Sequence, residues 1–189
     1  MAPGVLILTA IFTSIFGGVN TLWDRRYGFM NKALTSPISR SAIALGKMSA
    51  ISLIAALQAS LIIGIALAIG VTFPNPLMII PIMGIVILFS LGFSGISVTL
   101  AATAKSQETF WGMINLLGMP LFMLSPALFP LELLPNWLAV VAKLNPVTYT
   151  VLLVRELMTG VSEGGVPILI SIAVIFAFVV AMVAIASYV

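Results

Sequence analysis

The chain has 189 residues, of which 61% are hydrophobic and only 7% are charged. Eight basic and five acidic side chains are too few to cover a water-facing surface, since an ordinary soluble domain is about 25% charged. The composition therefore excludes a soluble globular protein and a disordered chain, and it predicts an all-α polytopic membrane protein.

Five largely uncharged stretches are long enough to cross a membrane, since about 20 helical residues span the hydrocarbon core. They cover residues 1–23, 47–72, 77–104, 109–131 and 164–189 of a single membrane domain. The uncharged stretch between Lys47 and Lys105 suits two crossings, because Pro74 and Pro76 predict a turn between them. The first stretch is interpreted as a span and not as a signal peptide, because the basic pair follows the apolar run.

The loop 24–47 carries most of the positive charge of the chain. It holds five of the eight basic residues: Arg25, Arg26, Lys32, Arg40 and Lys47. Because loops rich in Lys and Arg stay in the cytoplasm, we predict a multi-pass cell-membrane protein with this loop inside. The N-terminus then lies outside and the C-terminus inside, and Trp23 and Tyr27 lie at the inner interface, where aromatic residues are enriched.

Within this loop, residues 24–34 are predicted to form a short helix that Asp24 caps. Tyr27, Met30 and Leu34 share one apolar stripe of that helix. Ser36–Pro37 is expected to begin the next helix, which continues into the second span. Two interpretations stay open, namely a basic helix lying on anionic lipid and a docking element for a cytoplasmic partner.

Residues 126–160 are strongly apolar but interrupted by proline. The prolines of this segment are Pro126, Pro130, Pro135 and Pro146. We predict two short helices that dip back into the outer leaflet, the first beginning at Pro135–Trp137. Asn145–Pro146 would end the first helix and begin the second. An ordinary external loop with interfacial helices is the alternative.

Polar residues inside the spans are few. Thr9, Thr13 and Asn20 share one helical face, which either packs against another helix or lines a translocation route. Asn115 is added to the candidate route, although single amides inside a span, such as Asn115 and Gln58, more often hold helices together. A stripe of small residues is interpreted as close helix packing and not as a pore. It consists of Ser90, Ser94, Ser97 and Ala101.

The chain lacks the residues that most enzymes need. It contains no Cys and no His, which excludes thiol nucleophiles, zinc–thiolate sites and histidine-based catalysis. The five acidic residues are scattered, and Gly46–Lys47 is followed by Met48, so the pattern of a phosphate-binding loop fails. We expect neither an enzyme nor a bound metal or cofactor, and no nucleic-acid partner.

Three patches resemble the membrane subunit of ABC-2 type transporters, the permease family of drug, lipid and polysaccharide exporters that includes the daunorubicin-resistance kind. The first runs from Ala2-Pro3-Gly4 through Gly17-Gly18 to Trp23-Asp24-Arg25-Arg26-x-Gly28-Phe29. The second is Leu34-x-x-Pro37-x-Ser39-Arg40, followed by Leu45-Gly46-Lys47. The third and most specific is Phe129-Pro130-Leu131-x-x-Leu134-Pro135-x-Trp137-Leu138, followed by Asn145-Pro146-x-Thr148-Tyr149 and Arg155.

The resemblance implies a role for each patch. A coupling region would dock on a separate ATP-binding subunit that holds ATP and Mg²⁺: Asp24, Arg25, Arg26, Tyr27, Gly28, Met30, Leu34, Pro37 and Arg40. Outer re-entrant helices would gate the exit: Phe129, Pro130, Leu134, Pro135, Trp137, Asn145, Pro146 and Tyr149. A second permease copy, identical or related, would complete the route. The family normally has six spans, so this chain resembles a permease that begins at the second span.

The predicted function is therefore an exporter permease driven by ATP hydrolysis on a partner chain. A non-transporting membrane scaffold, or an inactive permease fragment, is the alternative. An ion-coupled secondary transporter is disfavoured, because such proteins usually need carboxylates inside their spans. The sequence does not identify the substrate.

Overall fold

The computed structural model of this chain describes residues 2–29, 35, 38–70, 75–126, 135–160 and 165–188. Every regular element in these ranges is a helix. The elements are α1 (Ala2–Arg26), α3 (Arg40–Ala68), the short 3₁₀ helix η1 (Pro76–Met78), α4 (Ile79–Thr103), α5 (Gln107–Met123), α6 (Asn136–Lys143), α7 (Pro146–Thr159) and α8 (Ile168–Tyr188).

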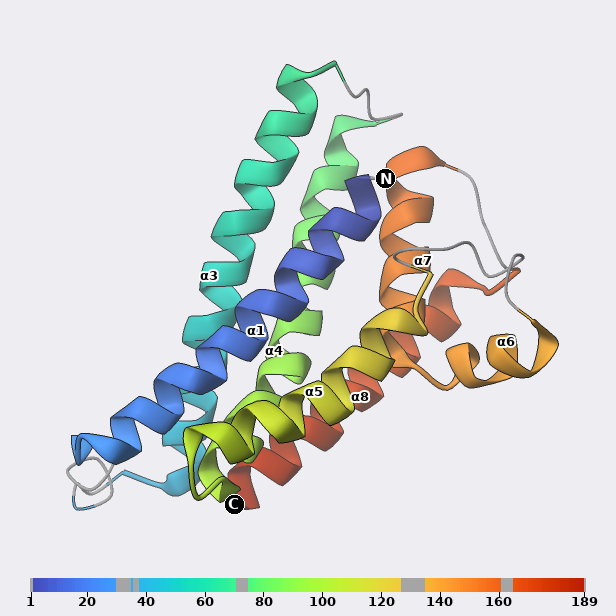
Figure 1. Cartoon of the computed structure of the whole chain (residues 1–189). Helices are drawn as coiled ribbons and strands as arrows, with labels where there is room; N and C mark the ends of the chain where they lie inside the picture. The colour runs from blue at the N-terminus through green and yellow to red at the C-terminus, as the bar shows by residue number, and fades with distance from the viewer. Residues whose placement is uncertain are drawn as a thin grey trace.

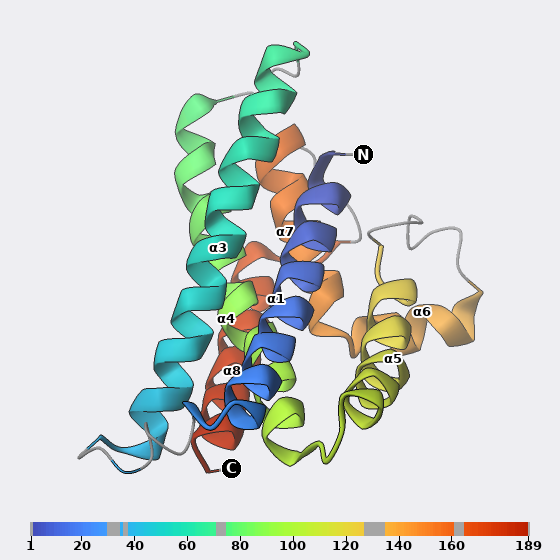
Figure 2. The ribbon, with the colours of Figure 1, turned by 60° about the vertical axis from the view of Figure 1, so that its left-hand side comes forward.

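The long helices run side by side and alternate in direction (Figures 1 and 2). One end of the bundle, here called the basic end, contains the end of α1, the start of α3, the α4–α5 turn and the C-terminus (Figure 1). The N-terminus and the α3–η1 connection lie at the opposite end (Figure 1). This alternation agrees with the predicted order of loops, in which 24–47 and the turn near Lys105 share one side.

Helix α4 forms the centre of the bundle and contacts α1, α3 and α8. Small residues allow close approach, since a Cβ added at Gly18 would lie 2.6 Å from the Cβ of Ser97. The Ser97 hydroxyl donates to the carbonyl of Ser14 at 2.6 Å, which ties α4 to α1. Ser90, Ser94, Ser97 and Ala101 are all fully buried. The interpretation of this stripe as close helix packing is confirmed.

Among the described residues, four helices are long and apolar enough to cross a membrane: Pro3–Arg26, Arg40–Ala68, Pro76–Thr103 and Ile168–Tyr188. The structure thus supports four of the five predicted spans. In place of the fifth, α5 has 17 residues, and at 1.5 Å per residue it is about 26 Å long, less than the roughly 30 Å of a hydrocarbon core. Pro120 lies in its final turn, where a missing N–H weakens helix continuation.

Two predicted helix starts near the basic end are wrong. Asp24 does not cap a new helix, because α1 continues through Arg26 and ends in a turn where Gly28 adopts a φ of 76°. A positive φ is accessible to glycine at little cost, so the chain turns at Gly28 and a continuous helix over 24–34 is excluded. The next long helix begins at Arg40 and not at Pro37, because the Ser39 hydroxyl accepts the Ala42 N–H at 3.3 Å.

The two short helices of the predicted outer segment begin at the predicted residues. Pro135 precedes the first residue of α6, and Pro146 is the first residue of α7. The Asn145 side chain accepts the Val147 N–H at 3.0 Å and so caps α7. In both views α6 lies beside the middle of the bundle, and α7 runs from there toward the end that holds the N-terminus (Figures 1 and 2).

Candidate functional site

The charged residues at the basic end bind other helices of the same chain. Asp24 forms an ion pair with Lys47, which joins the last turn of α1 to the second turn of α3. The Arg25 guanidinium donates through Nη1 to the carbonyls of Ala101, at 2.7 Å, and Ala102 at the end of α4. A cation suits this position, because the last carbonyls of a helix are unpaired and carry partial negative charge.

Other residues of the predicted coupling region face outward. Tyr27 is 74% exposed, and the neighbouring Phe29, which was not among the predicted coupling residues, is 61% exposed. Arg26 and Arg40 are also exposed. The structure therefore divides the predicted coupling region into residues that bind other helices of the chain, the half-buried Asp24 and the exposed Arg25, and residues available to another surface. Met30, Leu34 and Pro37 lie outside the described residues.

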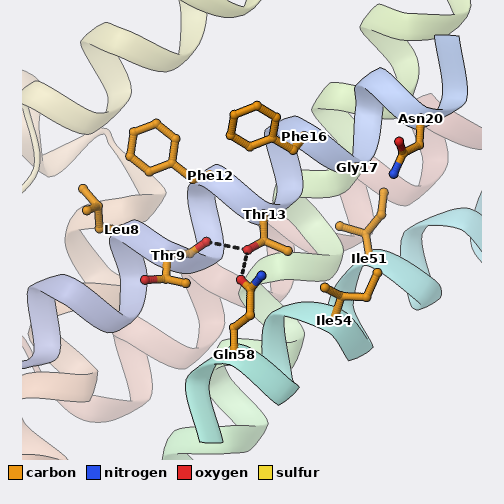
Figure 3. A pocket seen from close by; sticks show the side chains of 10 residues that line it. All are labelled: Leu8, Thr9, Phe12, Thr13, Phe16, Gly17, Asn20, Ile51, Ile54 and Gln58. Atoms are coloured by element: carbon orange, nitrogen blue, oxygen red, sulfur yellow. Dashed lines mark hydrogen bonds between the residues drawn. The ribbon is translucent and has the colours of Figure 1, made fainter. Parts of the chain in front are cut away.

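A pocket of about 410 Å³ lies between α1 and α3, and it contains three of the four residues predicted for the translocation route (Figure 3). Its lining comprises Leu8, Thr9, Phe12, Thr13, Phe16, Gly17 and Asn20 of α1 with Ile51, Ile54 and Gln58 of α3. The Thr13 hydroxyl donates to the Thr9 carbonyl at 2.8 Å and contacts the side-chain amide of Gln58. The polar side chains of Thr9, Thr13 and Gln58 thus lie together, Asn20 lies at one end, and the rest of the lining is apolar (Figure 3).

The fourth predicted route residue, Asn115, does not line this pocket and lies on the exposed side of α5. Gln58 does line it, and from the sequence it was interpreted only as a residue that holds helices together. The sequence around Gln58 gives no sign that it lines a pocket, because its contact Thr13 belongs to a different helix, 45 positions away in the chain. Within the described ranges, no three Asp, Glu, His or Cys side chains lie close enough together to hold a metal ion.

Helix α5 lies beside α1 on the side away from α3 (Figure 2), and two of its rings contact pocket-lining rings of α1. The Phe16 and Trp111 rings meet edge to face with centroids 5.9 Å apart, and the Phe12 and Phe122 rings are 6.4 Å apart. The face of α1 that exposes Phe12, Phe16 and Asn20, here called the open face, therefore has a helix on each side. An arrangement of aromatic rings beside hydroxyl and amide groups suits an amphipathic ligand.

The predicted gate residues that the structure describes lie where α5, α6 and α7 meet. The side-chain amide of Asn145 donates to the Leu121 carbonyl near the end of α5. The Tyr149 hydroxyl donates to the Lys143 carbonyl at 2.7 Å, which joins α7 to α6. Pro135 and Trp137 lie at the start of α6, and Pro146 begins α7. Phe129, Pro130 and Leu134 fall outside the described residues.

Arg155 of α7 also reaches α5. Its Nη2 donates to the Pro126 carbonyl at 2.9 Å, just beyond the end of that helix. The arginine thus joins two segments that are 29 positions apart in the chain.

The sequence matches the family model of the ABC-2 type transporter over residues 1–159. It is 31% identical to the putative transport permease ycf38 of Cyanophora paradoxa, over 82% of this chain and 54% of that protein. It is 24% identical to nodulation protein J of Sinorhizobium fredii, over 94% and 68%. It is 23% identical to the daunorubicin resistance ABC transporter permease protein DrrB1 of Streptomyces coeruleorubidus, over 84% and 56%.

The chain spans about half the length of the ycf38 relatives it matches, with 54%, 56% and 52% of their residues covered. The matched region includes the end of α1, the start of α3 and the α4–α5 turn at the basic end, together with the α1–α3 pocket and all of α6 and α7. With four long apolar helices and a family match over most of its length, the protein is a multi-pass membrane protein that belongs to the permease family of ABC-2 type transporters.

Proposed function

We propose that this chain is the membrane subunit of an ATP-driven exporter and that amphipathic molecules pass along the open face of α1. The pocket around Thr13 and Gln58 supports this proposal, because it places hydroxyl and amide groups beside apolar side chains, where they can bind the polar part of an amphipathic molecule. The size of the pocket, about 410 Å³, falls within the range of small-molecule sites. Drug-like molecules, lipids and polysaccharides are the candidate substrate classes.

A second permease copy would close the route. The face of α1 between α3 and α5 exposes Phe12, Phe16 and Asn20, and an exposed amide is poorly solvated by lipid tails. A copy of the same or a related chain that opposes this face would shield Asn20 and give the route two similar walls. The short helices α6 and α7 would then lie at the outer side and gate the exit.

A separate ATP-binding subunit would supply the energy from the cytoplasmic side, which we assign to the basic end. Two exposed aromatic side chains, Tyr27 and Phe29, follow directly after the last turn of α1. Exposed aromatic residues flanked by arginine are typical of protein interfaces. ATP can drive the cycle only if the partner subunit binds two permease conformations with different affinity.

Co-purification tests this docking surface. We expect the double change Tyr27→Asp and Phe29→Asp to abolish recovery of a co-expressed ATP-binding cassette subunit, because two carboxylates would have to be desolvated in the interface. The matched control, Tyr27→Phe with Phe29→Tyr, keeps the rings and should retain the complex. Full recovery with the two aspartates would contradict the assignment of this surface.

Transport itself is tested with the complex reconstituted in vesicles. An exporter should show ATP hydrolysis that one substrate class stimulates, together with ATP-dependent flux of that class. A non-transporting scaffold, the alternative function, would bind the ATP-binding subunit and show neither.

A further inference from the structure

Helix α5 is held mainly at its ends. Along its length only Phe110, Ile114 and Gly118 are buried, a single stripe with a spacing of four residues. Leu116 and Met119 are 76% and 56% exposed. In lipid, exposed apolar side chains give no preference for one helix position over another, because lipid tails are as apolar as Leu. The middle of α5 therefore resists displacement only weakly.

The base of α5 is fixed through Arg25. The α4–α5 connection consists only of residues 104–106, so the end of α4 and the start of α5 must move together. Arg25 Nη1 donates to the Ala101 carbonyl at 2.7 Å and lies 3.4 Å from the Ala104 carbonyl, which belongs to this connection. The Asp24–Lys47 ion pair holds the same turn of α1 against α3. The Arg25 guanidinium thus joins the end of α1 to the connection from which α5 begins.

The far end of α5 is fixed by α7. Asn145 donates to the Leu121 carbonyl, and Arg155 donates to the Pro126 carbonyl at 2.9 Å. Asn145 is only 4% exposed. Hydrogen bonds from charged or buried donors are strong where water is excluded, and they are directional, so they fix position more sharply than apolar contact does.

We propose that Arg25 is a positioning residue that carries movement of the docked end of α1 to α5, with Arg155 holding the opposite end. This inference rests on the proposed function for the source of the movement. Arg25 immediately precedes the exposed residues Arg26 and Tyr27, so a partner that displaces them also displaces the guanidinium. The α4–α5 turn then follows, and α5 tilts beside the open face of α1 and its pocket.

Cross-linking in a cysteine background tests the two anchors separately. Since the chain contains no Cys, introduced pairs are the only thiols. The pair Phe16→Cys and Trp111→Cys reports the base of α5, and the pair Phe12→Cys and Phe122→Cys reports its far end, where the parent rings are 5.9 and 6.4 Å apart. A short thiol-reactive cross-linker is added to the purified chain, and the rate of intramolecular linkage is measured.

We expect Arg25→Met to slow linkage at the base pair about tenfold, the change that corresponds to one charge-assisted hydrogen bond, and to affect the far pair less. Arg155→Met should give the reverse pattern. Arg25→Lys should fall between Arg25→Met and the parent, because an ammonium group is a compact donor without the planar fork. Arg26→Met removes the same charge one position further on and should change neither rate.

Equal rates in Arg25→Met and the parent, or equal slowing of both pairs, would overturn the proposal, since the second result indicates general destabilisation. If Arg25→Met does not fold, Arg25→Lys gives the same comparison. In the complex with the ATP-binding subunit, a non-hydrolysable ATP analogue with Mg²⁺ should change the base-pair rate in the parent and not in Arg25→Met. Failure to form that complex would count against the proposed function. The inference about Arg25 would then be decided by the linkage rates of the two cysteine pairs in the isolated chain.

Discussion

Helices α4 and α5 follow one another in the chain, yet they are held in opposite ways. Helix α4 is surrounded by α1, α3 and α8 and buries small and aromatic residues along its length, from Ile82 to Ala101. Helix α5 buries one stripe of three residues, and side chains of α1 and α7 bind the connection before it, its last turn and the residues just after it. One helix is positioned by shape and the other by a few directional hydrogen bonds.

The difference shows how a membrane bundle can combine rigidity with movement. Close packing of small residues is distributed over many contacts, so no single displacement is easy. A helix held by terminal hydrogen bonds can pivot when one of them is lost. We therefore expect a transport cycle to leave the close-packed middle of α1, α4 and α8 unchanged, and to move α5 together with the ends of α1 and α4 at the basic end.

The largest expected effect comes from filling the close contact between α1 and α4. A Cβ at Gly18 would lie 2.8 Å from the backbone oxygen of Ser97, so Gly18→Leu must push two helices apart. We expect a loss of about 1–3 kcal/mol, the usual cost of overpacking, seen as a lower melting temperature of the purified chain in detergent. Gly112→Leu on α5 is the matched control, because a Cβ there meets nothing within 4 Å. Similar losses for both changes would remove the contrast between the two helices.

Asn145→Ala should have the next largest effect, because it removes both the cap of α7 and the donor to the Leu121 carbonyl. Loss of such a cap costs about 1 kcal/mol, and the carbonyl left without its partner adds to it. Asn75→Ala removes a comparable cap from the short, exposed helix η1 and should cost less. Melting temperatures of the two variants give the comparison, and an equal decrease would argue against a structural link between α7 and α5.

The smallest effect is expected at the pocket. Thr13→Val and Gln58→Leu each remove one side of the contact between α1 and α3. Interhelical polar contacts inside membranes average about 0.6 kcal/mol, so a double-mutant cycle should give a coupling free energy of that order. Both variants should nevertheless change which substrate class stimulates ATP hydrolysis, because each removes a polar group from the middle of the pocket lining. Unchanged stimulation would place the route elsewhere.

The hydrophobic stretches and prolines of the sequence predicted most of the architecture. Four spans follow from long apolar runs, and the starts of α6 and α7 follow from Pro135 and from Asn145–Pro146, because proline restricts where a helix can begin. The errors near the basic end have one origin. Asp24 and Pro37 both fit local rules for a helix start, but Asp24 pairs with Lys47 of another helix and Ser39 provides the cap that forms.

Taken alone, the sequence determined the membrane class, the basic loop, the serine stripe and the family, because each depends on composition, local order or spacing along one helix. Only the tertiary structure decided the partners of individual polar groups. It placed Arg25 against the end of α4, Arg155 against the end of α5 and Gln58 against Thr13. These contacts join residues 29 to 76 positions apart, and no local pattern encodes which helices meet when most of their surfaces are equally apolar.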